Sequence, residues 1–223
     1  CYNKLDRLIF STHKPHTMIP LMVDFTESQV IIFGGGVVGA RKARYFAYEA
    51  EVVVYSRSFH PEFREIPVRT EVCNLTGDEK ELRNIVSGSS LVIAATSDPG
   101  LNEQIKSACD KEHIWCNVAS GKKGDVVLPA KISGSHYVIA VSTDGSVPAV
   151  SRLIREELEN SFPDLDDLVE LGRWIRETYR GERTGPDSYD TVLYSALRDP
   201  ETRKALASGM KDAREHVLRK FAI

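Results

Sequence analysis

Short apolar runs alternate with amphipathic segments through the first half of the chain. Five runs are predicted as strands, at residues 30–33, 52–55, 68–74, 91–95 and 114–118. Helical patterns separate them, at residues 40–48, 78–86 and 99–111. Strands that alternate with helices in this way favour a parallel sheet with helices on both faces. The carboxyl ends of such strands form the edge at which ligands bind.

The pattern changes beyond residue 118. Two further strands are predicted, at residues 126–129 and 136–141, and helices follow at residues 149–160, 163–180, 189–197 and 200–221. The fold class is therefore predicted as α/β, with an N-terminal Rossmann parallel sheet, a small β-rich region and a C-terminal helical module. The predicted boundaries are residues 1–17 for an N-terminal extension, 18–118 for the Rossmann domain, 119–150 for the β-rich region and 151–223 for the helical domain.

A glycine-rich turn follows the first predicted strand and precedes the first predicted helix. Its residues are Gly34, Gly35, Gly36, Val37, Val38 and Gly39, which fit the G-x-G-x-x-G pattern. In dinucleotide-binding folds the first glycine permits the tight turn, the second lets the backbone approach the pyrophosphate, and the third lets the helix pack closely. These six residues are therefore predicted to bind NAD at the start of the helix. The alternatives are a different adenosine ligand and a turn that binds nothing.

The second predicted strand ends in Ser56, Arg57 and Ser58, at the place where an acidic residue usually binds the ribose of NAD. A serine hydroxyl is able to hydrogen-bond a ribose hydroxyl instead. Arg57 is suited to a 2′-phosphate, so NADP stays open as the alternative cofactor. Thr96 follows the fourth predicted strand at the same edge and completes the predicted cofactor-binding set.

Composition narrows the class of function. The net charge of the 223 residues is −3, which provides no overall basic surface for nucleic acid. No apolar run approaches the roughly 20 residues that cross a bilayer, so no membrane partner is predicted. The four cysteines form no C-x-x-C pair, which predicts a reduced, cytoplasmic protein. No cluster of His, Cys and Asp has metal-ligand spacing, so no metal site is predicted.

Several motifs occur in an order that one protein family shares. They are PLMVD at residues 20–24, GGGVVGARKAR at 34–44, AATSDP at 94–99 with Asn102, CNV at 116–118, LPA at 128–130, VSTDGSVP at 141–148 and RLIREEL at 152–158. On these residues the chain resembles the precorrin-2 dehydrogenase module of siroheme synthases. The glycine-rich motif and the segment at residues 142–148 are together the most specific part of the resemblance.

The resemblance implies a Rossmann domain, a β-rich dimerisation region and a helical module that assemble as an intertwined homodimer. It implies NAD-dependent oxidation of precorrin-2 to sirohydrochlorin in siroheme biosynthesis, and some members of the family also insert Fe²⁺. Precorrin-2 is a tetrapyrrole ringed by carboxylates, for which a basic pocket is expected. The residues considered for that pocket are Arg41, Lys42, Arg44, Lys122, Lys123, Arg152 and Arg155.

The chain departs from the family at the residue expected to act as general base. The family usually has an aspartate three or four residues beyond the position of Asn117, and this chain has Ser120 and Gly121 there. Serine is a weak base, so Ser120 and the next acid downstream, Asp125, are the candidate catalytic residues. The absence of the aspartate weakens the prediction of iron insertion most, because metal insertion requires removal of N–H protons from the tetrapyrrole. Hydride transfer depends mainly on how the substrate is positioned against the cofactor. The open alternatives are another NAD(P)-dependent Rossmann oxidoreductase and a non-catalytic NAD-sensing module.

Overall fold

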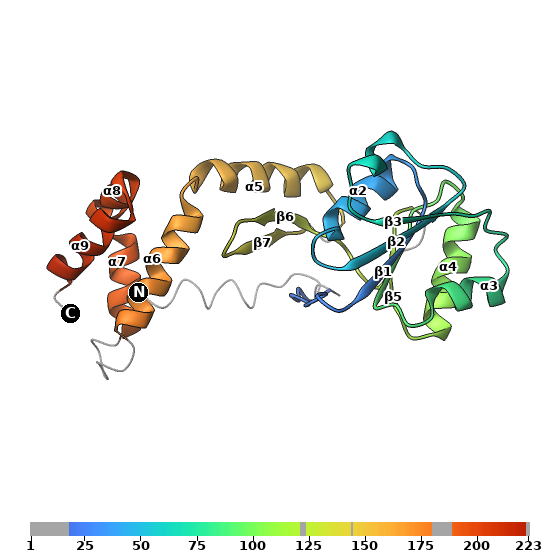
Figure 1. Cartoon of the computed structure of the whole chain (residues 1–223), viewed down its shortest axis with the longest axis horizontal. Helices are drawn as coiled ribbons and strands as arrows, with labels where there is room; N and C mark the ends of the chain where they lie inside the picture. Colours follow the sequence, from blue (N-terminus) through green and yellow to red (C-terminus); the bar gives the residue numbers. More distant parts are fainter. Residues whose placement is uncertain (1–17, 121–123, 144, 180–188, 222–223) are drawn as a thin grey trace. The chain divides into compact units, whose positions relative to one another are not determined.

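The computed structural model describes residues 18–120, 124–143, 145–179 and 189–221 of the chain (Figure 1). The chain divides into two compact units, with the boundary between Leu128 and Pro129. The N-terminal unit contains a parallel sheet between two layers of helix. The C-terminal unit contains a hairpin and a set of helices.

Five parallel strands form the sheet of the N-terminal unit, in the order β3-β2-β1-β4-β5. Their bounds are β1 Gln29–Phe33, β2 Glu51–Ser56, β3 Arg69–Val72, β4 Leu91–Ala94 and β5 Trp115–Val118. The register places Ile31 of β1 between Val53 of β2 and Val92 of β4. The strand order reverses at β1, and parallel sheets of this kind bind ligands at the carboxyl ends of the strands beside such a reversal.

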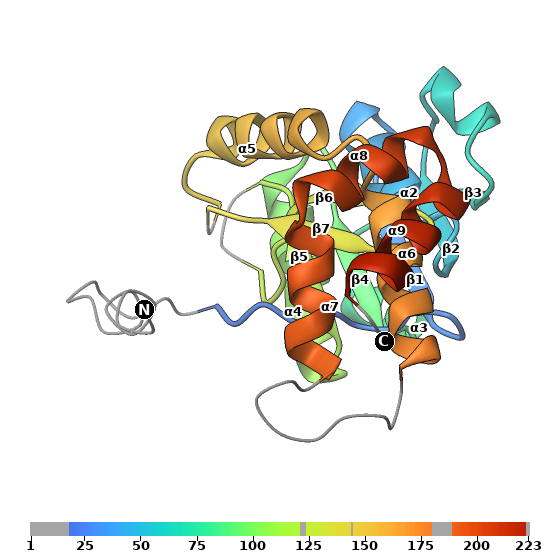
Figure 2. The same cartoon turned by 90° about the vertical axis from the view of Figure 1, so that its left-hand side faces the viewer.

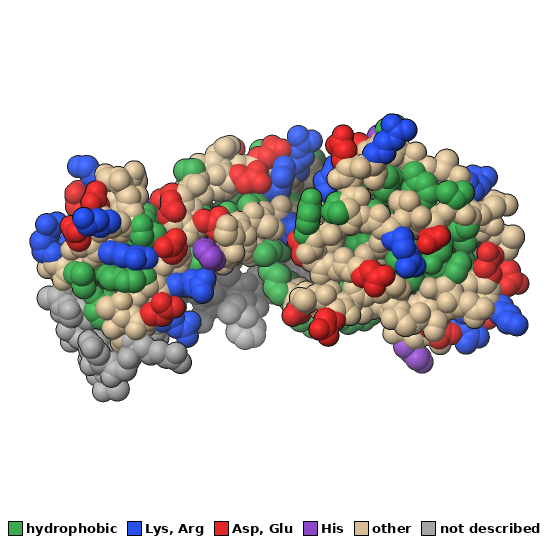
Figure 3. Space-filling view, viewed as in Figure 1, with side chains coloured by type: hydrophobic (Ala, Val, Ile, Leu, Met, Phe, Trp, Pro, Cys, Tyr) green, Lys and Arg blue, Asp and Glu red, His purple; other side chains and the backbone are tan. Residues whose placement is uncertain are grey.

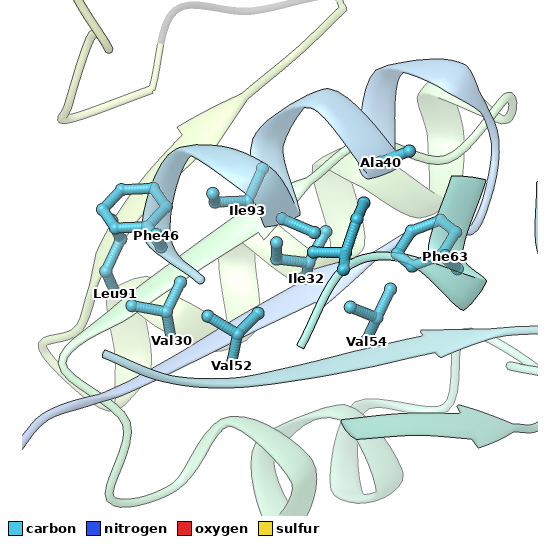
Figure 4. Close-up of a cluster of buried hydrophobic side chains, with 11 residues drawn as sticks. Val30, Ile32, Ala40, Phe46, Val52, Val54, Phe63, Leu91 and Ile93 are labelled. Carbon is cyan, nitrogen blue, oxygen red and sulfur yellow. The ribbon is translucent and has the colours of Figure 1, made fainter. Parts of the chain in front are cut away.

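Helices cover both faces of this sheet. They are α2 Val37–Phe46, the 3-10 helix η1 Pro61–Arg64, α3 Glu79–Val86 and α4 Pro99–Lys111. Side chains alternate between the two faces along each strand. On one face, Val30 and Ile32 of β1 pack with Ala40 and Phe46 of α2 and with Phe63 of η1, as Figure 4 shows.

The opposite face of the sheet packs against α3 and α4. Ile31 and Phe33 of β1 point to this side, and Leu82 of α3 and Ile105 of α4 are fully buried there. Burying one such side chain contributes about 1.5–3 kcal/mol to the free energy of unfolding. The central strands β2, β1 and β4 are apolar on both sides because both of their faces are covered, which is what continuous apolar runs indicate in a parallel sheet.

The structure confirms the predicted α/β sheet and its strands, whose ends differ from the prediction by one or two residues. The first helix differs more. The sequence predicts a start at residue 40, whereas α2 starts at Val37. Gly36 takes the N-cap position with extended backbone angles, φ −78° and ψ −172°. Val37 and Val38 of the glycine-rich motif therefore belong to the helix itself.

The C-terminal unit begins with an antiparallel hairpin of β6 Ala130–Ser133 and β7 Val138–Val141, which α5 Pro148–Ser161 follows. This hairpin confirms the predicted β-rich region. The strand predicted at residues 126–129 is wrong, because β6 starts only after Pro129. Proline has no N–H to donate to a strand ladder. The carbonyl of Val126 already accepts a hydrogen bond from the Asn117 side chain.

Further helices complete the described part of the C-terminal unit, and Figure 2 looks onto them where they pack together. They are α6 Leu165–Thr178, α7 Tyr189–Arg198, α8 Pro200–Ser208 and α9 Met210–Lys220. Leu171, Ile175 and Val217 are fully buried in their core. The single helix predicted over residues 200–221 is wrong. Gly209, with φ +142°, ends α8 and caps α9 in a conformation that favours glycine.

Asp199 ties α8 to α9. Its carboxylate caps α8 by accepting a hydrogen bond from the N–H of Thr202 at 3.2 Å. It also accepts from His216 Nε2 at 3.0 Å and from Lys220 Nζ at 2.7 Å, both on α9. The hydrogen bond from Lys220 is the largest reason why the pKa of Asp199 lies well below its ordinary value. These contacts hold the last two described helices together.

Candidate cofactor and active site

Gly34 makes the sharp turn that ends β1. Its φ of +121° lies in the region that favours glycine, and a Cβ at this position would overlap the carbonyl oxygen of Ala95. The N–H of Gly34 donates to the carbonyl of Tyr55 at 2.9 Å, and the N–H of Ala95 donates to that of Phe33 at 2.8 Å. The turn therefore lies directly against the carboxyl end of β4, where the motif predicts it.

Gly35 is buried against the segment that follows β2. A Cβ on Gly35 would overlap the carbonyl oxygen of Ser58 and would lie 2.9 Å from the Cβ of Ser56. The carbonyl of Gly35 accepts a hydrogen bond from the N–H of His60 at 2.7 Å. Ser56 is half-buried, whereas Arg57 and Ser58 are exposed. The structure thus brings the glycine-rich turn and the three residues considered for the ribose to one edge of the sheet.

Gly36 faces open space. It is exposed, and a Cβ added to it would meet no atom within 4 Å. It is also the N-cap of α2, a helix with no side-chain cap and no acidic residue in its first turn. The first N–H groups of α2 and the positive end of its dipole are therefore available to an anion. This open cradle at Gly36, Val37 and Val38 fits the pyrophosphate of a dinucleotide.

Gly39 lies in the first turn of α2 and lets that helix approach the end of β1. A Cβ on Gly39 would overlap the carbonyl oxygen of Gly34, which is backbone and has no freedom to rotate away. Gly39 itself is buried. The two glycines therefore fix the distance between the helix start and the turn, and with it the shape of the open cradle.

A buried asparagine joins the two loops that follow β4 and β5. Asn102 of α4 is fully buried, and its Oδ1 accepts hydrogen bonds from the N–H of Thr96 at 3.1 Å and from the Thr96 hydroxyl at 2.7 Å. Its Nδ2 donates to the carbonyl of Thr96 and to Ser120 Oγ, each at 3.1 Å. The structure therefore brings Thr96 and Ser120, both of them predicted site residues, together at the carboxyl edge of the sheet.

Asp125, the other candidate catalytic residue, lies beside β5. One carboxylate oxygen accepts a hydrogen bond from the N–H of Cys116 at 3.1 Å, and the other lies 3.2 Å from Lys106 Nζ of α4. The N–H of Asp125 donates in turn to the carbonyl of Cys116 at 2.8 Å. Asp125 thus satisfies backbone groups of an edge strand. Its contacts tie it to Cys116 rather than to the Asn102 and Ser120 pair.

Asn117 of β5 carries a buried acceptor without a partner. Its Nδ2 donates to the carbonyl of Val126 at 2.7 Å, which fixes the orientation of the amide. Its Oδ1 is buried and has no hydrogen-bond partner among the residues that the structure describes. Leaving such a group unpaired costs about 1–3 kcal/mol. An orphaned acceptor one residue before the end of β5 is a second feature of this edge that fits a polar ligand.

The basic residues considered for a carboxylate-rich substrate are partly neutralised by acids. The pairs are Arg44 with Glu62 at 2.8 Å, Arg152 with Glu156 at 2.7 Å and Arg155 with Glu159 at 3.5 Å. Burial, and to a lesser extent the neighbouring Arg41, lower the pKa of Lys42. Lys122 and Lys123 lie outside the described residues. Figure 3 shows charges of both signs over α5 rather than a uniformly basic surface.

The described residues contain no group of three or more His, Cys, Asp and Glu side chains that is arranged to hold a metal ion. No helix in the described part of the chain is both long and apolar enough to cross a bilayer. Cys73, Cys109 and Cys116 are free thiols. The contact with Cys116, together with burial, raises the pKa of Cys109 far above its ordinary value, so this thiol stays protonated and unreactive.

Sequence reasoning assigned no role to the side chain of Asn102. The sequence held one weak indication, because asparagine has a low helix propensity and yet lies inside the helix predicted at residues 99–111. Asp98, in contrast, has the capping role that its position before Pro99 indicates, since it accepts hydrogen bonds from the first N–H groups of α4. The partners of Asn102 lie six residues before it and 18 residues after it, which no local pattern reports.

A sequence family described as NAD(P)-binding matches residues 21–130. With the strand order and the open cradle at the start of α2, this match defines the chain as a Rossmann NAD(P)-binding protein. A precorrin-2 dehydrogenase of Methanosarcina barkeri is 31% identical to it over 91% of this chain and 92% of that protein. The chain belongs to the precorrin-2 dehydrogenase family.

Siroheme synthases match over part of their length. The siroheme synthase of Citrobacter koseri is 31% identical over 65% of this chain but only 32% of its own length, so the chain spans about a third of such relatives. Among solved structures, one named SirC, precorrin-2 dehydrogenase, superposes with a TM-score of 0.68 at 21% identity. The superposition covers 91% of this chain and 100% of that chain, and it confirms the fold class.

Proposed function

We propose that this chain oxidises precorrin-2 to sirohydrochlorin with NAD, in the biosynthesis of siroheme. The observation that carries the proposal is the open cradle at Gly36, at the uncapped start of α2 and beside the Ser56 to Ser58 segment. The Methanosarcina barkeri relative, a precorrin-2 dehydrogenase, aligns with most of the chain and not with the NAD-binding part alone. Both units therefore belong to the proposed enzyme.

NAD would lie along the carboxyl edge of the parallel sheet. The first N–H groups of α2 would hold the pyrophosphate, and the hydroxyls of Ser56 and Ser58 would bind the adenosine ribose. Thr96 lines the edge beside β4. When bound, NAD supplies the acceptor for a hydride. A 2′-phosphate would meet the exposed Arg57, so a comparison of turnover with NAD and with NADP decides between the two cofactors.

Oxidation of the tetrapyrrole removes a hydride and a proton, so the protein has to hold the reacting carbon beside the cofactor and leave a path for the proton. Holding the reactants in position is the larger contribution to such a step. Of the two candidate catalytic residues, Ser120 lies with Thr96 at the carboxyl edge, whereas Asp125 is engaged with Cys116 and Lys106. We therefore propose Ser120 at the ligand and Asp125 as a support for β5.

The test is the formation of NADH when the purified protein is mixed with precorrin-2 and NAD⁺ in the absence of air. We expect the absorbance of NADH to rise together with the spectrum of sirohydrochlorin. Cofactor binding without tetrapyrrole turnover would favour the alternatives, another NAD(P)-dependent oxidoreductase or a non-catalytic NAD-sensing module. Adding Fe²⁺ to sirohydrochlorin and protein tests iron insertion separately.

We also propose that the chain forms a homodimer and that its α5 takes part in the interface. Val147, Val150, Leu153 and Ile154 recur at helical spacing and are 40–56% exposed, which leaves an apolar stripe on one side of α5. Arg152 lies on another side of the helix. We propose residues 18–118 as the Rossmann domain, 119–150 as the dimerisation region and 151–223 as the helical domain, with α5 extending the interface across the last of these boundaries. The cytoplasm is the proposed compartment.

Replacing Leu153, the most exposed residue of the apolar stripe, by glutamate is expected to shift the protein from dimer to monomer, because it places a charge on the stripe. Sedimentation equilibrium measures the shift. Arg152→Gln is the matched control on the same helix and is expected to leave the dimer intact. A wild-type protein that sediments as a monomer, or a Leu153→Glu variant that stays dimeric, would contradict the proposed interface.

A further inference from the structure

The orientation of the Asn102 amide is fixed by its partners. The backbone N–H of Thr96 is always a donor, and it lies 3.1 Å from the amide oxygen of Asn102. The carbonyl of Thr96 is always an acceptor, and it lies 3.1 Å from the amide nitrogen. A flipped amide would set donor against donor and acceptor against acceptor. The group that faces Ser120 Oγ is therefore the N–H of Asn102.

This orientation decides what the Ser120 hydroxyl is able to do. A hydroxyl has one proton to donate and lone pairs to accept with. Asn102 Nδ2 donates to Ser120 Oγ, so the oxygen is held as an acceptor on its buried side. Ser120 is otherwise exposed. Its proton is then left to point outward, at the edge where the ligand lies in the proposed function.

We propose that Ser120 acts as an oriented hydrogen-bond donor to an acceptor oxygen of the bound ligand, and that Asn102 is the residue that positions it. The proposal rests on the proposed function of this edge and changes the role of Ser120 from candidate base to donor. Two ligand oxygens have the required chemistry. One is the carbonyl of the nicotinamide carboxamide, and the other is a carboxylate of the tetrapyrrole.

Ser120→Ala and Ser120→Thr form the matched pair that tests the donor, because threonine keeps the hydroxyl and alanine removes it. We expect Ser120→Ala to weaken binding of one ligand about tenfold and Ser120→Thr to restore most of that loss. NADH titration reports on the carboxamide. Titration with sirohydrochlorin, followed by its absorption spectrum, reports on a carboxylate. Both measurements need no turnover, so they stay informative if precorrin-2 is not the substrate.

If Ser120→Ala loses affinity for NADH alone, the acceptor oxygen belongs to the cofactor. If it loses affinity for sirohydrochlorin alone, the acceptor oxygen belongs to the tetrapyrrole. Unchanged affinities for both ligands in Ser120→Ala would overturn the proposal. The proposal would also be overturned if Ser120→Ala binds both ligands with normal affinity but turns over more slowly and loses a titrating group from its pH profile. That result would identify Ser120 as a base.

The positioning role of Asn102 has its own test. In Asn102→Asp, a carboxylate still accepts both hydrogen bonds from Thr96, but its other oxygen has no N–H for Ser120 and faces the carbonyl of Thr96, which lowers the stability of the variant. The Ser120 hydroxyl is then expected to donate its proton to the carboxylate introduced at position 102, so that it no longer donates to the ligand. Asn102→Asp should therefore weaken the same ligand as Ser120→Ala, with no added loss in the double variant. Additive losses would overturn the positioning role, and if Asn102→Asp does not fold, the comparison of Ser120→Ala with Ser120→Thr decides the proposal.

Discussion

Replacement of Gly36 by aspartate is expected to abolish NAD binding while it leaves the fold at least as stable as before. The added side chain meets no atom within 4 Å, and the backbone at Gly36 is extended, so the substitution fits. Aspartate is among the best N-cap residues, and its charge suits the start of a helix, which is worth about 0.5–1 kcal/mol to α2. The same carboxylate occupies the place of the pyrophosphate.

Repulsion between that carboxylate and a phosphate about 4 Å away is worth about 4 kcal/mol at the dielectric of a protein surface, close to a thousandfold in Kd. NADH titration and thermal unfolding measure the two effects separately. Gly36→Ser is the matched control, since it caps α2 without a charge and should lose much less affinity. If Gly36→Asp binds NADH with wild-type affinity, the pyrophosphate does not lie beside Gly36.

Gly39→Ala is expected to destabilise the fold strongly, whereas Gly36→Asp is expected to leave its stability intact. Its Cβ would overlap the carbonyl oxygen of Gly34, so α2 has to move away from the end of β1. Because this overlap is with rigid backbone, we expect a cost of about 3 kcal/mol, at the upper end of overpacking effects. Chemical denaturation of the wild type and the variant measures it.

Gly100→Ala is the control in the same unit. Gly100 also lies in the first turn of a helix, but among the described residues the only atom within 4 Å of its added Cβ is Asp98 Oδ1 at 3.2 Å, which belongs to a side chain and not to the backbone. We expect its effect on stability to stay below about 1 kcal/mol, the size of the helix propensity difference between glycine and alanine. Similar effects at Gly39 and Gly100 would mean that the close approach of α2 to β1 is not a constraint.

The central strands β2, β1 and β4 were predictable because they are apolar on both faces. The runs around Ile31 and Ile93 have no polar alternation, and the structure buries both residues between two layers of helix. The same reasoning failed at residues 126–129, which are also apolar. There Val126 and Leu128 pack against the α2-side core as an irregular segment. Hydrophobicity indicates burial at both places, and only the pairing partners distinguish a strand from a covering loop.

The candidate site was predictable where one local motif builds it. The conformations expected of Gly34, Gly36 and Gly39 follow from a turn of six residues, and the structure shows the sharp turn, the open position and the close approach of the helix, while their binding of NAD stays a prediction. The link between Thr96, Asn102 and Ser120 was not predictable, because it joins a strand end, a helix and a second strand end. Such a link depends on the register of β4 and β5, which the sequence does not display.

The proposed function is tested most sharply by a single turnover of precorrin-2 by the wild type and by Gly36→Asp, with NADH and sirohydrochlorin followed at the same time. We expect the wild type to form both products together and in equal amounts, and the folded Gly36→Asp variant to form neither. Sirohydrochlorin formed at the wild-type rate by Gly36→Asp, or NADH binding by a wild type that leaves precorrin-2 unchanged, would contradict the proposed function.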